Sequence, residues 1–344
     1  MTKSEELLSA FSENFFFKEL VFDSLHFTPD GGSEIELADL LINLGDIIIA
    51  IQLKERNEKH QTHDIDKEMI WFQKKCKAAK SQVKDTLEFI SSGELPAFTN
   101  KRGQRVFFSS DAEMIPLVVF KNDTIISYPH LLEKHSDEGI NINCMSFEDF
   151  EKMCRMLSSP IEIVEYLKYR KIFAEKNGDV NYSIFTDDGE SIIITKPNNR
   201  EALIMQFLAE EYGVEEAEKH LLNLSIFRSL LYQIPEHIIE TSEENGSINL
   251  LTFFAHMNRC EISTFLEQLE STKLEAFEGS KGMLHSIRRE DGAYVIVFVS
   301  GAVIPIEALW MYICETKNIE VKHLLEIVIE WIDDVEYDMN FYLG

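Results

Sequence analysis

Two short apolar runs constrain the fold of this chain more than any other feature. They are ELADLLIN, residues 36–43, and DIIIAIQLK, residues 46–54, and only Leu44 and Gly45 separate them. Runs of this length, rich in β-branched residues and flanking a break that contains glycine, are typical of the two strands of a β-hairpin. We therefore predict a hairpin with a two-residue turn, in which Asn43 pairs with Asp46.

The hairpin is expected to lie between two helices. Residues 4–20 have apolar side chains spaced to form one helical face, and residues 65–90 repeat steps of three and four for seven turns. The second segment is the strongest amphipathic pattern in the chain. Further strands are predicted at 105–109 and 115–121, and further helices at 146–156 and 160–176.

A break at Asn177-Gly178-Asp179 predicts a domain boundary. The first domain, residues 1–176, is predicted to be an α/β (α+β) domain with a central mixed β-sheet flanked by helices. The second, residues 179–344, is predicted to be a mainly helical α+β domain, and the sequence leaves its role open between partner binding, substrate binding and dimerisation. Its expected elements are helices within 199–276 (including 214–222), a hairpin of 284–289 with 294–300, and helices at 305–316 and 319–332.

Composition narrows the class of protein. The 344 residues carry a net charge of −27, and 45% of them are hydrophobic, which is typical of a folded globular chain. The five cysteines are scattered and form no CxxC pair, so we expect reduced thiols rather than a disulfide framework or a zinc ribbon. No stretch reaches the ~20 apolar residues of a membrane span, and the acidic N-terminus does not resemble a signal peptide, so we expect a cytoplasmic protein without a membrane partner.

The charge is distributed unevenly. Residues 50–105 carry 12 Lys and Arg against 8 Asp and Glu, so that this segment is at +4 and the remainder at −31. Four lysines of the predicted helix 65–90 fall within about 100° of its circumference, opposite its apolar side. We interpret this stripe as a candidate phosphate-contacting surface, with a solvated helix face as the alternative. The candidate nucleic-acid contacts are Lys67, Lys74, Lys77, Lys84 and Gln82.

The hairpin carries a constellation suited to phosphodiester chemistry. Because side chains alternate along a strand, Asp39, Gln52 and Lys54 emerge on the same face. The Asp39 carboxylate, the Gln52 amide oxygen and the backbone carbonyl of Leu53 are hard oxygen ligands of the kind that Mg²⁺ or Mn²⁺ takes. The ammonium of Lys54 is suited to orient or deprotonate an attacking water and to offset phosphoryl charge. The alternative is an ordinary hairpin with polar strand ends.

Residues 36–54 resemble the active-site hairpin of the PD-(D/E)XK, or restriction-endonuclease-like, nucleases, and most of all the Mrr-like branch with Asp followed by Gln-x-Lys. The resemblance covers roughly residues 10–125, and implies a core of helix, β-meander, helix and strand. It implies catalytic roles for Asp39, Gln52 and Lys54. It also matches Glu19 to the acidic residue that many members place on the preceding helix, where it supports the metal site, so Glu19 is a further expected catalytic residue and metal ligand. The implied activity is a metal-dependent endonuclease acting on DNA, with a setting in bacterial defence against phage.

The chain departs from the family pattern at two positions, and other functions remain open. Ala38 stands where the family name implies proline, and Gln52 is neutral where most members have an acid. A nuclease-fold interaction protein without turnover, and an acidic mimic of nucleic acid, are therefore the alternatives. A homodimer or a partner protein held by the acidic C-terminal half is also open. We interpret the sequence H60-x-x-H63-D64 as a polar loop rather than a metal site.

Overall fold

The structure is a computed structural model of the chain. It divides into two compact units, unit 1 from Met1 to Glu218 and unit 2 from Lys219 to Gly344, and each is described by itself. The division falls later than the boundary expected at residues 177–178, so the next long helix belongs to unit 1. The described residues are 2–28, 32, 34–62, 64–122, 132–134, 140–157, 159–177, 183–185, 191–193, 198–213, 227, 246–279, 284–288, 294–301, 304–317, 323–331 and 337–343.

Unit 1 is built on a mixed sheet of six strands in the part of the chain described. β1, β4 and β5 form an antiparallel meander, β8 runs parallel to β5, β10 runs parallel to β8, and β9 pairs antiparallel with β10. The expected mixed sheet is therefore confirmed. In spatial order the strands are β1 (Val21–Asp23), β4 (Leu40–Asn43), β5 (Ile47–Glu55), β8 (Glu113–Lys121), β10 (Asn141–Ser146) and β9 (Leu132–Lys134).

Among the described residues of unit 1, three short strand pairs lie outside this sheet. The predicted strand 105–109 is reduced to one member of such a pair, whereas the predicted strand 115–121 is confirmed as β8. The pairs are β2 (His26–Phe27) with β3 (Ile35–Glu36), β6 (Phe98–Thr99) with β7 (Arg105–Val106), and β11 (Ser183–Phe185) with β12 (Ser191–Ile193).

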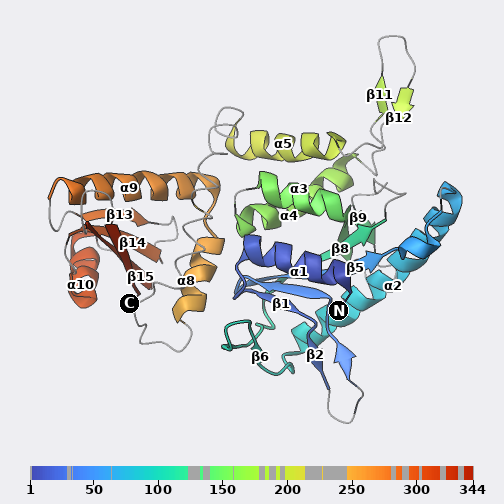
Figure 1. Ribbon diagram of the computed structural model, residues 1–344, viewed down its shortest axis with the longest axis horizontal. Helices are drawn as coiled ribbons and strands as arrows, with labels where there is room; N and C mark the ends of the chain where they lie inside the picture. The colour runs from blue at the N-terminus through green and yellow to red at the C-terminus, as the bar shows by residue number, and fades with distance from the viewer. Residues whose placement is uncertain are drawn as a thin grey trace. The chain divides into compact units, whose positions relative to one another are not determined.

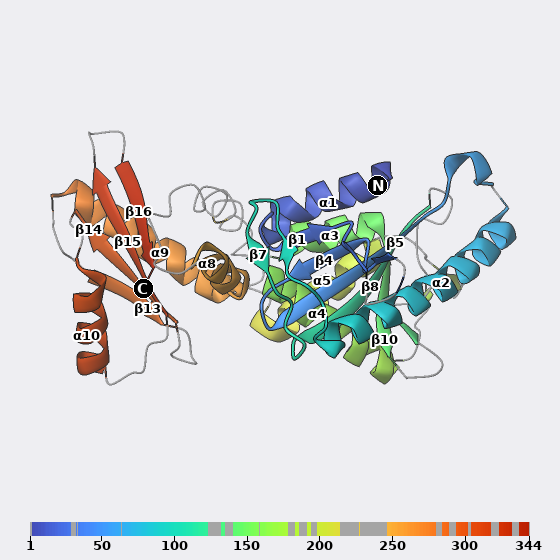
Figure 2. The same ribbon diagram turned by 90° about the horizontal axis from the view of Figure 1, so that it is seen from below.

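Helices cover both faces of the sheet of unit 1 (Figures 1 and 2). Side chains of β10 show the division, because Ile142 and Cys144 pack beneath α2, whereas Asn143 donates a hydrogen bond to the carbonyl of Leu167 in α4, at 3.4 Å. α1 packs against β1, α3 against β8 and β10, and α5 against α3 and α4. The helices are α1 (Lys3–Phe16), α2 (Ile65–Ser92), α3 (Phe147–Met156), α4 (Pro160–Asn177) and α5 (Asn198–Tyr212), with a 3-10 turn, η1 (Glu58–His60).

The first helix ends earlier than predicted. A capping box of Thr2 and Glu5 begins α1, but the helix stops at Phe16 because Phe17 adopts φ 68° and its carbonyl accepts a hydrogen bond from the N–H of Leu20 at 3.0 Å. The prediction that Glu19 lies on a helix is therefore wrong, and Glu19 lies in the turn that precedes β1.

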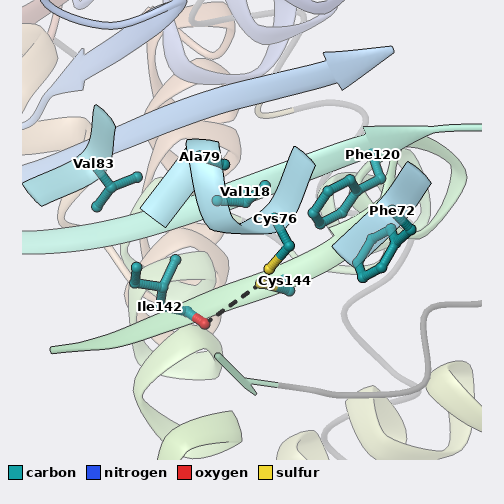
Figure 3. Packing of buried hydrophobic residues seen from close by; sticks show 8 residues of the cluster. All are labelled: Phe72, Cys76, Ala79, Val83, Val118, Phe120, Ile142 and Cys144. Atoms are coloured by element: carbon teal, nitrogen blue, oxygen red, sulfur yellow. Dashed lines mark hydrogen bonds between the residues drawn. The ribbon is translucent and has the colours of Figure 1, made fainter. Parts of the chain in front are cut away.

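The long amphipathic helix is confirmed, and its apolar side forms much of the core on one face of the sheet. Four residues of α2 pack against β8 and β10, and the rings of Phe72 and Phe120 lie 4.3 Å apart (Figure 3). The N-cap Asp64 and the left-handed Gly93, at φ 71°, set the two ends of the helix. The core residues are Phe72, Cys76, Ala79, Val83, Val118, Phe120, Ile142 and Cys144.

Unit 2 contains a second mixed sheet, of four strands in the part described. β14 and β15 run parallel and are joined through α10, while β13 and β16 pair antiparallel at the two edges. α9 and α10 lie on opposite faces, because Phe265 of α9 contacts Phe298 of β14, whereas Leu309 of α10 packs against Val297. The elements are α8 (Gly246–Ala255), α9 (Arg259–Phe277), β13 (Leu284–Arg288), β14 (Tyr294–Ser300), α10 (Ile306–Lys317), β15 (His323–Trp331) and β16 (Tyr337–Leu343).

The hairpin and the helix expected at 305–316 are confirmed in unit 2, but the helix expected at 319–332 is wrong. That segment contains β15, and residues 324–329 are buried on both faces of the sheet. A strand buried on both faces has a nearly continuous apolar run, which cannot be told from a buried helix by periodicity. The helix expected at 214–222 lies outside the described residues. None of the described helices has the length and apolarity required to cross a membrane.

One acidic side chain lies inside the core of unit 2. Glu326 of β15 is 1% exposed between Leu324 and Val328, and its Oε1 accepts a hydrogen bond from the backbone N–H of Ile304 at 3.0 Å. Burial raises the pKa of this carboxyl more than the Ile304 N–H lowers it. A carboxyl with a raised pKa in the folded state stabilises the fold while it is protonated, and this contribution is lost as pH rises through the folded pKa.

We expect Glu326→Gln to stabilise the protein at neutral pH by roughly 1 kcal/mol, because a neutral amide avoids the cost of a buried charge. The gain should shrink as pH falls and the wild-type carboxyl becomes protonated. Hydrogen exchange of peptides covering β15 in the full chain measures the effect, with the exposed Glu330→Gln on the same strand as control. Equal protection of wild type and Glu326→Gln at every pH would contradict this prediction.

Candidate functional site

The β4–β5 hairpin has a different register from the one predicted, and the observed register brings Asp39 closer to Gln52. Leu40 pairs with Ile51 and Asn43 with Ile48, so the predicted pairing of Asn43 with Asp46 is wrong. The N–H of Leu44 bonds to the carbonyl of Ile47 at 2.8 Å, so the turn consists of Gly45 and Asp46 rather than of Leu44 and Gly45. The register moves by two residues, which keeps every side chain on its predicted face. Continued by one position, it sets Asp39 opposite Gln52 rather than opposite Ala50.

The structure brings Asp39, Gln52 and Lys54 together at the C-terminal end of β5. The Lys54 ammonium lies among three oxygen atoms: 3.5 Å from Asp39 Oδ2, 3.2 Å from Gln52 Oε1 and 3.0 Å from the carbonyl oxygen of Leu53. The N–H of Leu53 also donates to Asp39 Oδ2 at 2.7 Å. The side chains of Asp39 and Lys54 are 11% and 12% exposed, and Gln52 is 3% exposed. We call these three side chains with the Leu53 carbonyl the oxygen cluster.

The electrostatics of the oxygen cluster are dominated by burial of Asp39. Burial raises the pKa of this carboxyl, and the Lys54 ammonium and the Leu53 N–H lower it by less. The charge of Glu5 in α1 also raises the pKa of Asp39, which shows that a second carboxylate lies within electrostatic range. Glu5 was not among the predicted site residues. Its only signal in the sequence was its place in the first turn of the helix that precedes the hairpin.

Glu19 is not part of the oxygen cluster. It is 2% exposed and forms an ion pair with Nε of Arg102, and its backbone carbonyl accepts a hydrogen bond from Asn100. The N–H of Asn43 bonds to the carbonyl of Leu20, so Glu19 lies near the turn end of the hairpin. Asp39 lies at the opposite end of β4. The antiparallel pairing of β1 with β4 therefore separates the two carboxylates along the strand direction.

The lysine stripe lies on α2, the helix that covers the face of the sheet from which Gln52 and Lys54 emerge. Gln52 pairs with Val118 and Lys54 with Phe120, and both of these partners pack beneath α2. The stripe itself is on the outer side of α2, as its exposure shows. Lys67, Lys74, Lys77 and Gln82 are exposed, whereas Lys84 is half-buried and paired with Glu88 at 3.4 Å. Lys67 pairs with Asp64 at 3.0 Å.

The loop after β5 is fastened to α2 through one buried carboxylate. Glu68 is 0% exposed and accepts hydrogen bonds from the guanidinium of Arg56 at 3.0 Å, from Asn122 at 2.9 Å and from the N–H of Thr62 at 3.1 Å. Burial raises the pKa of Glu68, but these hydrogen bonds lower it by more. The pKa of this carboxyl therefore lies below its usual value. Arg56 also lies over the ring of Trp71, 5.4 Å from its centre. This network connects the residues that follow β5 and β8 to the first turns of α2.

The described residues of the histidine motif, His60 and Asp64, have structural roles in this loop. Asp64 is the N-cap of α2 and accepts a hydrogen bond from the N–H of Lys67 at 3.3 Å. His60 ends η1, and its carbonyl accepts a hydrogen bond from Arg56 at 2.5 Å. His63 lies outside the described residues.

The donors of the oxygen cluster fit a hard cation, although the acidic content is low. Within the described ranges, no group of three or more His, Cys, Asp or Glu side chains could hold a metal ion. The oxygen cluster instead offers one carboxylate, one amide oxygen and one backbone carbonyl, all of which are ligand types of Mg²⁺ or Mn²⁺. Such a set leaves room for water among the ligands.

Unit 2 supplies an internal comparison. It repeats the order hairpin, helix, parallel strand in β13, β14, α10 and β15. Its central strand, however, has the sequence YVIVFVS and is buried from Val295 to Ser300. Because this strand has no acid, amide or lysine, the strand arrangement alone does not create an oxygen cluster. The polar residues at the end of β5 are specific to unit 1.

Comparison with known proteins gave no match. No family model, no curated protein and no solved structure is significantly similar to this chain.

We expect Glu68→Gln to destabilise the protein by about 3 kcal/mol at neutral pH, because it leaves Arg56 without its buried charge partner. The pKa of Glu68 is lowered in the folded state, so its contribution is present above the unfolded pKa and is lost as pH falls through the folded pKa. Denaturant unfolding from neutral to acidic pH measures this loss. The control is Glu88→Gln, which removes an exposed carboxylate of the same helix. Equal destabilisation by both variants would refute the prediction.

Proposed function

We propose that unit 1 is a metal-dependent nuclease that hydrolyses phosphodiester bonds in DNA. One observation carries the proposal: the Lys54 ammonium lies within 3.5 Å of Asp39, Gln52 and the Leu53 carbonyl, at one end of a paired strand. A lysine, a carboxylate and carbonyl oxygens in one largely buried cluster provide what in-line attack on phosphorus requires, namely charge neutralisation and ligands for a cation.

The order of elements supports a restriction-endonuclease-like core for unit 1. α1 is followed by the antiparallel strands β1, β4 and β5, then by α2 and by β8, which runs parallel to β5. This is the helix, β-meander, helix and strand that the sequence resemblance implies. The site residues of that resemblance, Asp39, Gln52 and Lys54, lie at one end of the central hairpin of this arrangement.

Each residue of the oxygen cluster has a proposed task. Asp39, Gln52 and the carbonyl of Leu53 would hold Mg²⁺ or Mn²⁺, and the bound cation would supply Lewis-acid activation of water and of the phosphoryl group. Lys54 neutralises negative charge that develops on the phosphoryl oxygens and orients the attacking water by hydrogen bonding. Leu53 holds Asp39 in position through its N–H. Glu5 adds negative charge near the cluster and so favours binding of a cation.

A nuclease-fold protein without turnover is the second candidate. It is favoured by Gln52, which is neutral and leaves Asp39 as the single carboxylate bonded to Lys54. Such a protein would bind DNA or a partner through the same surfaces without cleaving a bond. A role in bacterial defence against phage is the setting that the family resemblance suggests for either candidate.

We expect Asp39→Ala and Lys54→Ala each to reduce Mg²⁺-dependent cleavage of DNA by at least about 100-fold, because each removes a group proposed to contact the metal or the phosphoryl oxygens. Purified protein is incubated with DNA and with RNA in Mg²⁺, Mn²⁺ or EDTA. The matched controls are Asp111→Ala and Lys171→Ala, which remove an exposed acid and an exposed lysine outside the cluster. Cleavage that survives both cluster substitutions would exclude this site, and metal binding without cleavage of any nucleic acid would favour the second candidate.

The lysine stripe on α2 gives a separate prediction for binding. We expect the double substitution Lys74→Ala with Lys77→Ala to weaken DNA binding for all sequences alike, because both lysines are proposed to bind phosphates rather than bases. The slope of log affinity against log salt should fall by about one unit for each phosphate that the variant no longer neutralises. Fluorescence anisotropy over a range of salt concentrations measures both effects. An unchanged slope would show that the stripe is a solvated helix face.

A further inference from the structure

We propose that Lys54 is an internal counter-cation of the oxygen cluster, and that a divalent cation binds tightly only after a substrate phosphate has drawn the ammonium away. Metal and nucleic acid would then bind cooperatively. This inference rests on the proposed function, since it concerns the regulation of the same site.

The hydrogen bonds of Lys54 support the first half of the proposal. An ammonium group has three N–H donors, and the structure gives this one three acceptors, at 3.5, 3.2 and 3.0 Å. These acceptors are the atoms proposed to hold the metal. The lone pairs that a cation would use are therefore already directed at Lys54, and the two cations compete for them.

Charge explains why the competition is strong. The cluster is neutral in this arrangement, because the carboxylate of Asp39 is balanced by Lys54 and Gln52 carries no charge. The cluster is also largely buried, where interactions between charges are stronger than in water. A divalent cation placed beside the ammonium would meet repulsion from Lys54 with a single carboxylate in direct contact to offset it. Departure of Lys54 removes that repulsion and leaves Asp39 without its partner at the same time.

A phosphodiester provides the alternative partner for the ammonium. Lysine has a flexible four-carbon stem and binds phosphate as a point charge, so its head can move while its backbone stays in β5. Its side chain is 12% exposed, and it is the last side chain of β5 on the α2 face of the sheet. Because coupling between two ligands is reciprocal, DNA that draws Lys54 away tightens metal binding, and the metal tightens DNA binding by the same factor.

Calorimetric titration of the whole 344-residue chain with Mn²⁺ tests this inference. Wild type should bind Mn²⁺ weakly alone and at least ~10-fold more tightly in the presence of a short phosphorothioate DNA duplex that resists cleavage. Lys54→Met should bind Mn²⁺ at least ~10-fold more tightly than wild type without DNA, and the duplex should add little. Lys54→Arg, which keeps the charge, and Lys171→Met, which removes an exposed lysine of α4, should not tighten the binding.

The outcomes separate this inference from the proposed function. If wild type cleaves DNA but its affinity for Mn²⁺ is the same with and without the duplex, the counter-cation role is wrong and the nuclease assignment stands. If neither Mn²⁺ nor Mg²⁺ binds wild type under any condition, the metal-dependent function fails as well. The comparison of wild type with and without DNA decides the inference even where Lys54→Met does not fold.

Discussion

The pairing of β5 on both of its edges is the constraint on which unit 1 depends. β4 pairs with one edge in antiparallel register and β8 with the other in parallel register. Helices cover both faces of this sheet and residues 47–53 are buried, so the polar residues at the end of the strand need partners within the fold. Gln52 and the Leu53 carbonyl find one in Lys54, and the Leu53 N–H finds one in Asp39. The candidate site is therefore also the solution to a local problem of folding.

The sequence predicted the clustering of Asp39, Gln52 and Lys54 better than it predicted the register of the hairpin that holds them. The predicted turn is misplaced by one residue, yet Asp39, Gln52 and Lys54 still share a face, because a register change of two residues preserves the alternation of a strand. Helix α2 was equally predictable, since its apolar stripe extends over many turns and packs as one surface. A prediction that rests on a pattern repeated along a whole helix or strand stays correct even where the predicted ends are wrong.

The features that failed depend on where an element ends or on what covers it. Glu19 was expected on a helix that in fact stops at Phe16, and no periodic pattern marks a stop caused by the positive φ of Phe17. β15 was expected to be a helix because a strand covered on both faces loses the alternation that identifies strands. Glu5 was missed because its relation to Asp39 arises from the packing of α1, which local spacing does not encode. The lysines of the stripe were located correctly on the outer side of α2, because their place follows from the period of the helix.

The neutral side chain of Gln52 determines the charge of the oxygen cluster. Most nucleases that the hairpin resembles have an acid at this position, and a second carboxylate would leave the cluster negative even with Lys54 in place. Here one carboxylate and one ammonium balance each other, and Lys54 hydrogen-bonds to both Asp39 and Gln52. Under the proposed counter-cation role, this neutrality would make the affinity for a cation depend on the position of the Lys54 ammonium. The chain has a net charge of −27, so its surface carboxylates also attract cations. A site that binds a cation only together with nucleic acid would differ from that acidic surface, because its cation binding depends on the substrate.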